Sequence, residues 1–132
     1  MVGPPEIVGP DSRSAPAGSD LFLQPTVFGP GPFQFQWYFE GRPLVGGTTT
    51  NLVLPNLQEA TSGNYRVTVS NAFGLRWSAP AMITALPSAP RILAAEPDMV
   101  SIPEGGPLRL ALTARGSEPI QYQWWLDGRT VP

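Results

Sequence analysis

The stretch that decides the fold is PFQFQWYFEGRPL, residues 32–44. Its first part alternates around one dominant aromatic, with Phe35 and Trp37 on the same side, which is the pattern of a half-buried strand. A turn at Gly41 closes this strand. A closely similar stretch, PIQYQWWLDGRTV, returns at residues 119–131. The chain is therefore organised as a repeat.

The repeat extends well beyond this stretch. Residues 105–131 align without gaps with residues 18–44, and a repeat of that length is a whole domain. We predict one complete domain over residues 1–86 and a second, truncated domain over residues 87–132. The positions that recur identically are Gly18, Leu21, Leu23, Thr26, Gly29, Pro32, Gln34, Gln36, Trp37, Gly41 and Arg42.

Composition favours an all-β protein. The 132 residues include 17 Pro and 14 Gly and show no convincing helical period. Short alternating segments joined by turns indicate a two-sheet sandwich. We expect strands at residues 5–8, 20–28, 33–38, 44–45, 51–57, 65–70 and 75–86, and a bend at residues 9–17. Pro25 lacks a backbone N–H, so the strand at residues 20–28 either bulges there or has this position at an open edge.

Charge and residue usage disfavour several function classes. The net charge is -2 and the 8 basic residues are scattered arginines, so we expect no nucleic-acid partner. No apolar run reaches the roughly 18 residues of a membrane span, and the N-terminus lacks signal-peptide regions. The absence of Cys and His excludes thiol nucleophiles, imidazole bases and common zinc sites. We therefore expect no enzyme and no cofactor.

These residues resemble the immunoglobulin-like fold, most closely the intermediate-set type found in tandem in bacterial surface proteins and muscle giant proteins. Trp37 matches the third-strand Trp, and Gly63-x-Tyr65-x-Val67 is similar to the Gly-x-Tyr-x-Cys motif, which makes Tyr65 the tyrosine corner. Asn71-x-x-Gly74 resembles the F–G hairpin signature. Its Asn lies closer to the Tyr than in fibronectin type III modules. The resemblance implies an immunoglobulin-like Greek-key β-sandwich.

Three departures from the family pattern affect stability. Pro25 and Val67 occupy the two usual Cys positions, so a disulfide that would contribute about 4 kcal/mol is absent. Thr61 replaces the usual Asp before the tyrosine corner. Trp124 is the core residue of the second repeat, but no strands follow to cover it, so we expect an exposed apolar face and a chain that belongs to a longer tandem array. The expected core of the first repeat is Leu23, Trp37, Leu54, Tyr65 and Val67.

No catalytic or metal constellation is visible. Glu40 and Asp127 are equivalent turn residues, so they are one motif seen twice rather than a carboxylate pair. A calcium site near the domain junction is an alternative that we weigh, but its candidate ligands lack the alternate spacing of a calcium loop. Those candidates are Asp11, Asp20, Glu96, Asp98 and Glu104.

The candidate binding surface is the outward face of the sheet that contains the Trp37 strand. Tyr and Arg are frequent interface anchors, and polar groups beside an aromatic ring also suit a sugar, whereas the alternative is an ordinary solvated face. Phe22 and Phe28 are expected outward. We expect Phe73, at a hairpin tip, and Trp77 to be exposed anchors for a binding partner. The alternative for Trp77 is that it packs under the return strand. The residues of the face are Gln34, Gln36, Tyr38, Arg66 and Thr68.

We expect a non-catalytic repeat of an exported or cell-surface multidomain protein, serving adhesion, protein recognition or spacing. The alternative is a carbohydrate-binding accessory module of an exported polysaccharide-degrading enzyme. Expected partners are neighbouring repeats of the same chain and a protein or glycan ligand.

Overall fold

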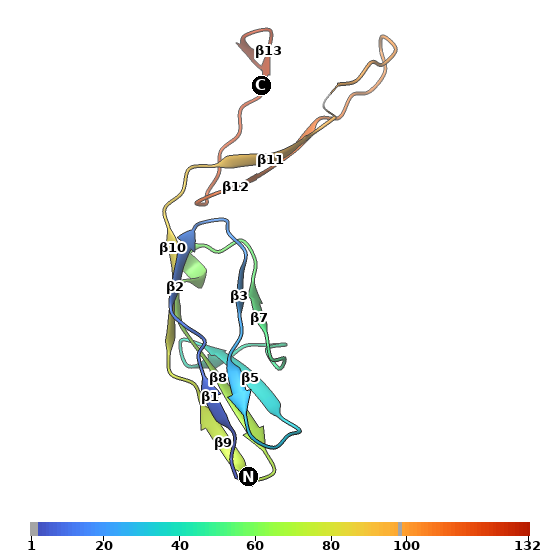
Figure 1. Cartoon of the computed structure of the whole chain (residues 1–132). Coiled ribbons are helices and arrows are strands. Elements are labelled where there is room, and N and C mark those ends of the chain that lie inside the picture. The colour runs from blue at the N-terminus through green and yellow to red at the C-terminus, as the bar shows by residue number, and fades with distance from the viewer. Residues whose placement is uncertain (1–2, 98) are drawn as a thin grey trace.

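A computed structural model describes residues 3–97 and 99–132, and it is all-β apart from one short 3-10 turn, η1 (Glu59–Thr61). The chain is elongated, with the N-terminus at one end (Figure 1). We call residues up to 86 the first unit and residues 87–132 the second unit. The predicted domain boundary at residue 86 stays a prediction.

The first unit is a two-layer sandwich. In one layer β1 (Glu6–Val8) pairs with β4 (Thr26–Phe28), and β3 (Leu21–Leu23) pairs with β7 (Leu52–Leu54). The other layer is a six-stranded sheet in which several neighbouring strands are not consecutive in the sequence. Its order is β2 (Arg13–Pro16), β10 (Ala81–Leu86), β8 (Gly63–Asn71), β5 (Gln34–Phe39) and β6 (Arg42–Pro43), with β9 (Gly74–Trp77) also paired to β8.

Trp37 lies at the centre of the core. Its side chain is fully buried, and its Nε1–H donates to the carbonyl of Thr49 at 2.8 Å. A buried indole needs such a partner, because leaving the N–H without one in an apolar interior costs free energy. The buried residues clustered with it come from both layers: Ala15, Leu21, Leu23, Leu54, Leu57, Tyr65, Val67 and Ile83.

A tight hairpin follows the Trp37 strand. Phe39 pairs with Arg42 across a two-residue loop in which Glu40 and Gly41 both have positive φ, 50° and 79°. Two consecutive residues with positive φ match the twist of the two hairpin strands. A glycine at the second position has no Cβ, so it adopts positive φ without steric cost. The Gln36 amide then donates to the carbonyls of Trp37 and Leu44, each at 3.0 Å. The stretch QWYFEGRPL is therefore a locally determined strand-and-turn unit.

One strand was not predicted. Residues 9–17 were expected to form a bend, but β2 lies within them and runs parallel to β10, with Ala15 opposite Ala85. The four residues of β2, Arg-Ser-Ala-Pro, have no strand pattern of their own. This segment becomes a strand because the edge of β10 is available for pairing and because Ala15 is buried there.

Three strand boundaries differ from the expectation. The strand expected at residues 44–45 lies at Arg42–Pro43 instead, because the two-residue loop starts pairing at once. The long return strand is split into β9 and β10 at Ser78, whose buried hydroxyl accepts the N–H of Val67 at 2.9 Å. The single strand expected at residues 20–28 is divided at Pro25, since β3 ends at Leu23 and β4 begins at Thr26.

The second unit repeats parts of the first. β11 (Arg91–Glu96) pairs with β12 (Ala111–Arg115), and β13 (Trp125–Leu126) pairs with β14 (Arg129–Thr130). The same turn recurs, with φ of 49° at Asp127 and 79° at Gly128. The Gln123 amide also donates to the carbonyls of Trp124 and Val131, at 3.0 and 3.1 Å. Trp124, however, is 41% exposed.

Tyr65 joins the start of β8 to the loop before it. Its hydroxyl donates to the carbonyl of Thr61 at 2.6 Å, and its ring lies 4.7 Å from that of Phe39. Burial, and secondarily the negative charge of Glu40, raise the pKa of Tyr65 to about 12. Both effects disfavour the phenolate in the folded state.

We predict that the free energy of unfolding falls between about pH 10 and about pH 12. The unfolded phenol ionises near pH 10, whereas the folded one keeps its proton until about 12, so its contribution is complete below pH 10 and is lost as pH rises. The expected loss is about 1–2 kcal/mol after allowance for solvent near the hydroxyl. Urea unfolding across this pH range measures it. Tyr65→Phe should abolish this part of the fall and Tyr38→Phe should keep it; equal falls in both variants would contradict the assignment.

Candidate functional site

The outward face of β5 and β8 brings the sequence-predicted surface residues together. Cross-strand pairing places Gln36 opposite Thr68 and Tyr38 opposite Arg66, while Gln34 lies opposite Ser70. Their exposure differs: Gln34 is exposed, Gln36, Tyr38 and Arg66 are half-buried, and Thr68 is only 5% exposed.

Trp77 adds an aromatic ring to this face and covers part of it. On β9 it lies opposite Thr68, and its ring is 4.7 Å from the ring of Tyr38. The guanidinium carbon of Arg66 is 4.9 Å from the centre of the indole, a cation–π geometry. Trp77 remains 46% exposed, so it lies on the outer face and not under the return strand. We call Tyr38, Arg66 and Trp77 the Trp77 cluster.

A shallow groove of about 610 Å³ runs beside Tyr38. Amide and hydroxyl side chains line most of it, so it offers uncharged hydrogen-bond donors and acceptors next to an aromatic ring. Nothing in its lining supplies a carboxylate or an imidazole. Its polar lining residues include Gln34, Gln36, Thr48, Thr68 and Ser70.

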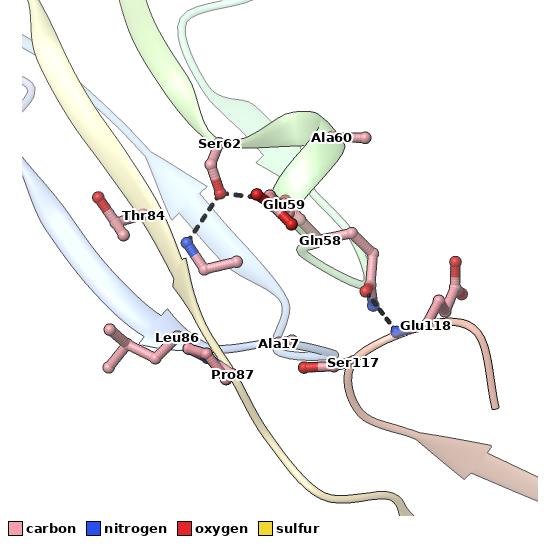
Figure 2. Close-up of a pocket in the computed structure, with 11 residues that line it drawn as sticks. Ala17, Gln58, Glu59, Ala60, Ser62, Thr84, Leu86, Pro87, Ser117 and Glu118 are labelled. Atoms are coloured by element: carbon pink, nitrogen blue, oxygen red, sulfur yellow. Dashed lines mark hydrogen bonds between the residues drawn. The ribbon is translucent and has the colours of Figure 1, made fainter.

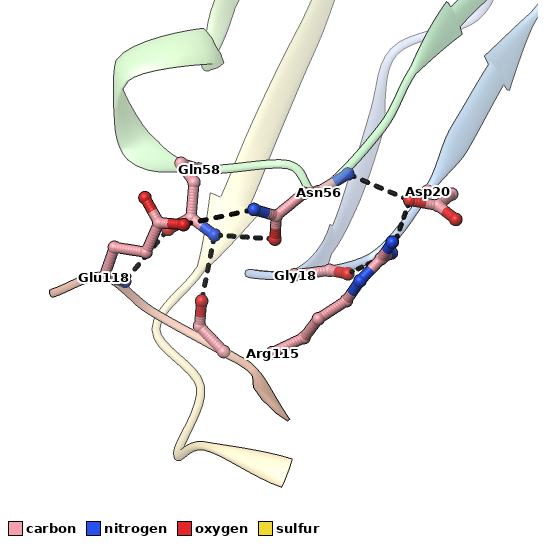
Figure 3. Close-up of polar contacts among 7 residues, drawn as sticks. Gly18, Asp20, Asn56, Gln58, Arg115 and Glu118 are labelled. Carbon is pink, nitrogen blue, oxygen red and sulfur yellow. Dashed lines mark hydrogen bonds and ion pairs between the residues drawn. The ribbon is translucent and has the colours of Figure 1, made fainter. Parts of the chain in front are cut away.

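A second site, which the sequence analysis did not find, lies where the two units meet (Figure 3). The Gln58 side chain binds the main chain of the second unit twice, since its Nε2 donates to the carbonyl of Gly116 at 2.9 Å and its Oε1 accepts the N–H of Glu118 at 3.0 Å. The Asn56 amide donates to the Glu118 carboxylate at 3.1 Å. We call Gln58 with residues 116–118 the Gln58 clasp.

An ion pair lies beside the clasp. Arg115 contacts the Asp20 carboxylate at 2.6 Å and donates to the carbonyl of Gly18 at 3.3 Å. Asp20 also accepts the backbone N–H of Asn56 at 2.9 Å. This hydrogen bond, followed by the Arg115 guanidinium, holds the pKa of Asp20 below its usual value. The carboxylate therefore keeps its charge to a lower pH than an isolated Asp would.

The same Asp20 was one of the weighed calcium ligands, and the structure places a cationic side chain against it. Asp98, another of them, lies outside the described residues. Within residues 3–97 and 99–132, no three acidic, Cys or His side chains gather in a way that would hold a metal ion.

Close backbone contacts complete the junction. A Cβ on Gly18 would lie 2.8 Å from the nitrogen of Gly116, which only a glycine avoids. The linker residue Ser88 donates its N–H to the Ser117 hydroxyl at 2.8 Å and accepts the N–H of Ser117 at 2.9 Å. A recess of about 700 Å³ remains between η1, the end of β10 and residues 117–118 (Figure 2).

The sequence carried one signal for this junction. At positions where the two repeats align, Asp20 corresponds to Pro107, and Arg115 corresponds to Phe28. Both members of the ion pair are therefore departures from the repeat. A position that differs between the repeats is free to serve a contact that belongs to one junction and not to the common fold.

Comparison with known proteins agrees with this architecture. A family model described as the immunoglobulin domain matches residues 4–71. The chain belongs to the immunoglobulin-domain family. The predicted immunoglobulin-like β-sandwich is confirmed.

Solved immunoglobulin-like structures share the fold at low sequence identity. Titin M4 is 20% identical with a TM-score of 0.57, over 65% of this chain and 99% of that chain. The titin I-band fragment I67–I69 is 16% identical with a TM-score of 0.58, over 100% of this chain and 50% of that one. Sidekick-1 immunoglobulin domains 1–5 are 18% identical with a TM-score of 0.55, over 98% of this chain and 28% of that one. The chain thus resembles tandem immunoglobulin repeats and spans half or less of the two multidomain structures.

No helix among the described residues is long and apolar enough to cross a membrane.

We predict that Trp77→Ala lowers the free energy of unfolding by about 1–2 kcal/mol, because it removes the ring pair with Tyr38 and the contact with Arg66 and uncovers Thr68. Urea unfolding at neutral pH measures this loss. Phe73→Ala is the matched control, since Phe73 is 51% exposed at the hairpin tip, and it should change stability by less than about 0.5 kcal/mol. Similar losses in both variants would show that the Trp77 cluster does not stabilise this face.

Proposed function

We propose that this chain is a non-catalytic spacing module of a multidomain protein, in which successive immunoglobulin-like units are held at a fixed angle. The observation that carries the proposal is the Gln58 clasp, in which one side chain binds a carbonyl and an N–H of the next unit. A side chain that bonds the main chain two residues apart restrains both position and rotation. Such a contact suits a protein that holds its units in a fixed relative orientation.

The neighbouring contacts support the same function. The linker Pro87-Ser88-Ala89-Pro90 is short and rich in Pro, so it acts as a semi-rigid spacer. Ser88 is bonded in both directions to Ser117. The exposed Asp20–Arg115 pair adds little energy alone, but it links a third segment of the first unit to the second unit.

Gln58→Ala should broaden the distribution of angles between the units without unfolding the first unit. Small-angle X-ray scattering and residual dipolar couplings of the full chain measure this distribution. Gln24→Ala, an exposed Gln away from the junction, should leave it unchanged. Wild-type chains that already sample many angles, or a Gln58→Ala chain with wild-type couplings, would refute a fixed joint.

A second proposed role is recognition of a protein or glycan by the outward face, in an exported or cell-surface setting where the module serves adhesion. The Trp77 cluster beside an uncharged polar groove favours this role, since exposed Trp, Tyr and Arg are common anchors at interfaces. The setting rests on the resemblance to tandem repeats of bacterial surface proteins.

The alternative function, that of a carbohydrate-binding accessory module, is tested by pull-down of the full chain on insoluble polysaccharides. If the groove binds sugar, Tyr38→Ala should lower retention at least about tenfold, because the aromatic platform is lost, while Phe73→Ala should retain wild-type binding. Absence of binding by the folded wild-type chain would exclude these polysaccharides and leave protein partners for this face.

A further inference from the structure

The side-chain amide of Gln58 has all of its hydrogen-bonding groups in use. Its two N–H donors bind the carbonyl of Gly116 at 2.9 Å and the side-chain oxygen of Asn56 at 3.1 Å, and its oxygen accepts the N–H of Glu118 at 3.0 Å. A primary amide offers two donors and one carbonyl acceptor, so this arrangement permits a single orientation of the group. A flexible side chain gives up rotamer freedom to hold one orientation. The clasp therefore benefits from a Gln58 main chain that is already fixed.

Thr61 fixes that main chain through both of its polar groups. Gln58 directly precedes η1 and is extended, with φ of -132° and ψ of 169°. Its N–H donates to the Thr61 hydroxyl at 3.0 Å, and its carbonyl accepts that hydroxyl at 3.1 Å and the Thr61 N–H at 3.0 Å. A side chain that reaches back from the third residue of a helical turn to the N–H before the turn is one half of a capping box. The Thr61 hydroxyl thus bonds both main-chain groups of the residue that forms the clasp.

Thr61 is in turn attached to the core of the first unit. Its carbonyl accepts the hydroxyl of Tyr65 at 2.6 Å, and Tyr65 is only 2% exposed. The next residue adds a second attachment, since the Ser62 hydroxyl donates to the Gln58 carbonyl at 3.1 Å and accepts the N–H of Ala85 on β10 at 2.8 Å (Figure 2). A continuous series of hydrogen bonds therefore runs from the core through Thr61 to the clasp.

We propose that Thr61 is a positioning residue of the joint, whose hydroxyl holds the Gln58 main chain so that the side-chain amide faces residues 116–118. The inference rests on the proposed function, because it takes the Gln58 clasp as the contact that orients the second unit. Each hydrogen bond that the structure describes for Thr61 lies within the first unit, so Thr61 acts through Gln58.

The residue type at position 61 fits this role. The family pattern places Asp there, and a charged carboxylate only accepts hydrogen bonds, whereas the hydroxyl of Thr61 both accepts and donates. Only a hydroxyl can therefore bind the N–H and the carbonyl of Gln58 at once. Val has nearly the shape of Thr without the hydroxyl, and Ser keeps the hydroxyl without the methyl. These two substitutions separate the effect of the hydrogen bonds from the effect of shape.

The amide N–H of Glu118 reports on the clasp directly, because it donates to the Gln58 side chain. Its hydrogen exchange is measured by NMR on the full ¹⁵N-labelled chain at neutral pH. We expect Thr61→Val to speed this exchange about three- to tenfold, as for one lost hydrogen bond, and Gln58→Ala to speed it at least as much. Thr61→Ser should restore the wild-type rate to within about twofold. Thr26→Val, at an exposed position of β4 away from the junction, is the matched control and should leave the rate unchanged.

Exchange in the core separates positioning from general stability. The amides of Val67 and Val69, both buried in β8, should keep their wild-type rates in Thr61→Val. An acceleration there equal to that at Glu118 would assign Thr61 a structural role and overturn the proposal. Wild-type exchange at Glu118 in Thr61→Val, together with fast exchange in Gln58→Ala, would also overturn it but leave the joint itself intact. A Glu118 amide that is unprotected in the wild-type chain would overturn the fixed joint, and the positioning role with it.

Discussion

The burial of Trp37 is the interaction on which the first unit depends. Its indole is removed from water, its Nε1–H is bonded to Thr49, and its backbone N–H and carbonyl are bonded to Gly47 and Leu44. Burying an aromatic side chain of about 150–250 Å² contributes roughly 4–6 kcal/mol. That is comparable to the roughly 4 kcal/mol of the missing inter-sheet disulfide. A cysteine-free sandwich is therefore physically reasonable here.

The outer face depends on a small irregularity in the sheet. Ser78 interrupts the return strand and bonds Val67 through both its hydroxyl and its backbone, while its carbonyl accepts the Nε–H of Arg66. Arg66 is thereby fixed next to Trp77. Trp77 lies opposite Thr68 on the neighbouring strand and its ring packs on Tyr38, so the side chains of this face contact one another.

Much of the fold was predictable because its signals are local. Alternation around Trp37, the Glu40-Gly41 turn and the Asn71–Gly74 hairpin each depend on a few adjacent residues, and parity alone placed Gln34, Gln36 and Tyr38 outward. The missed features depend on partners distant in sequence. β2 requires the edge of β10, the burial of Thr68 requires Trp77, and the Gln58 clasp requires the second unit. No local pattern of Ser, Pro or Gln encodes such contacts.

The ion pair at the junction distinguishes the first unit from the second. Asp20 has no counterpart in the second unit, where Pro107 stands, and Arg115 has none in the first, where Phe28 stands. Two copies of the first unit joined head to tail would place Phe28 against Asp20. The interiors of the two units share a common pattern, whereas Asp20 and Arg115 at their facing ends differ from the repeat and form a pair. The side chains at the junction therefore specify which unit comes first. If the order of the two units were exchanged, each unit would keep its fold but the Asp20–Arg115 contact between them would be lost.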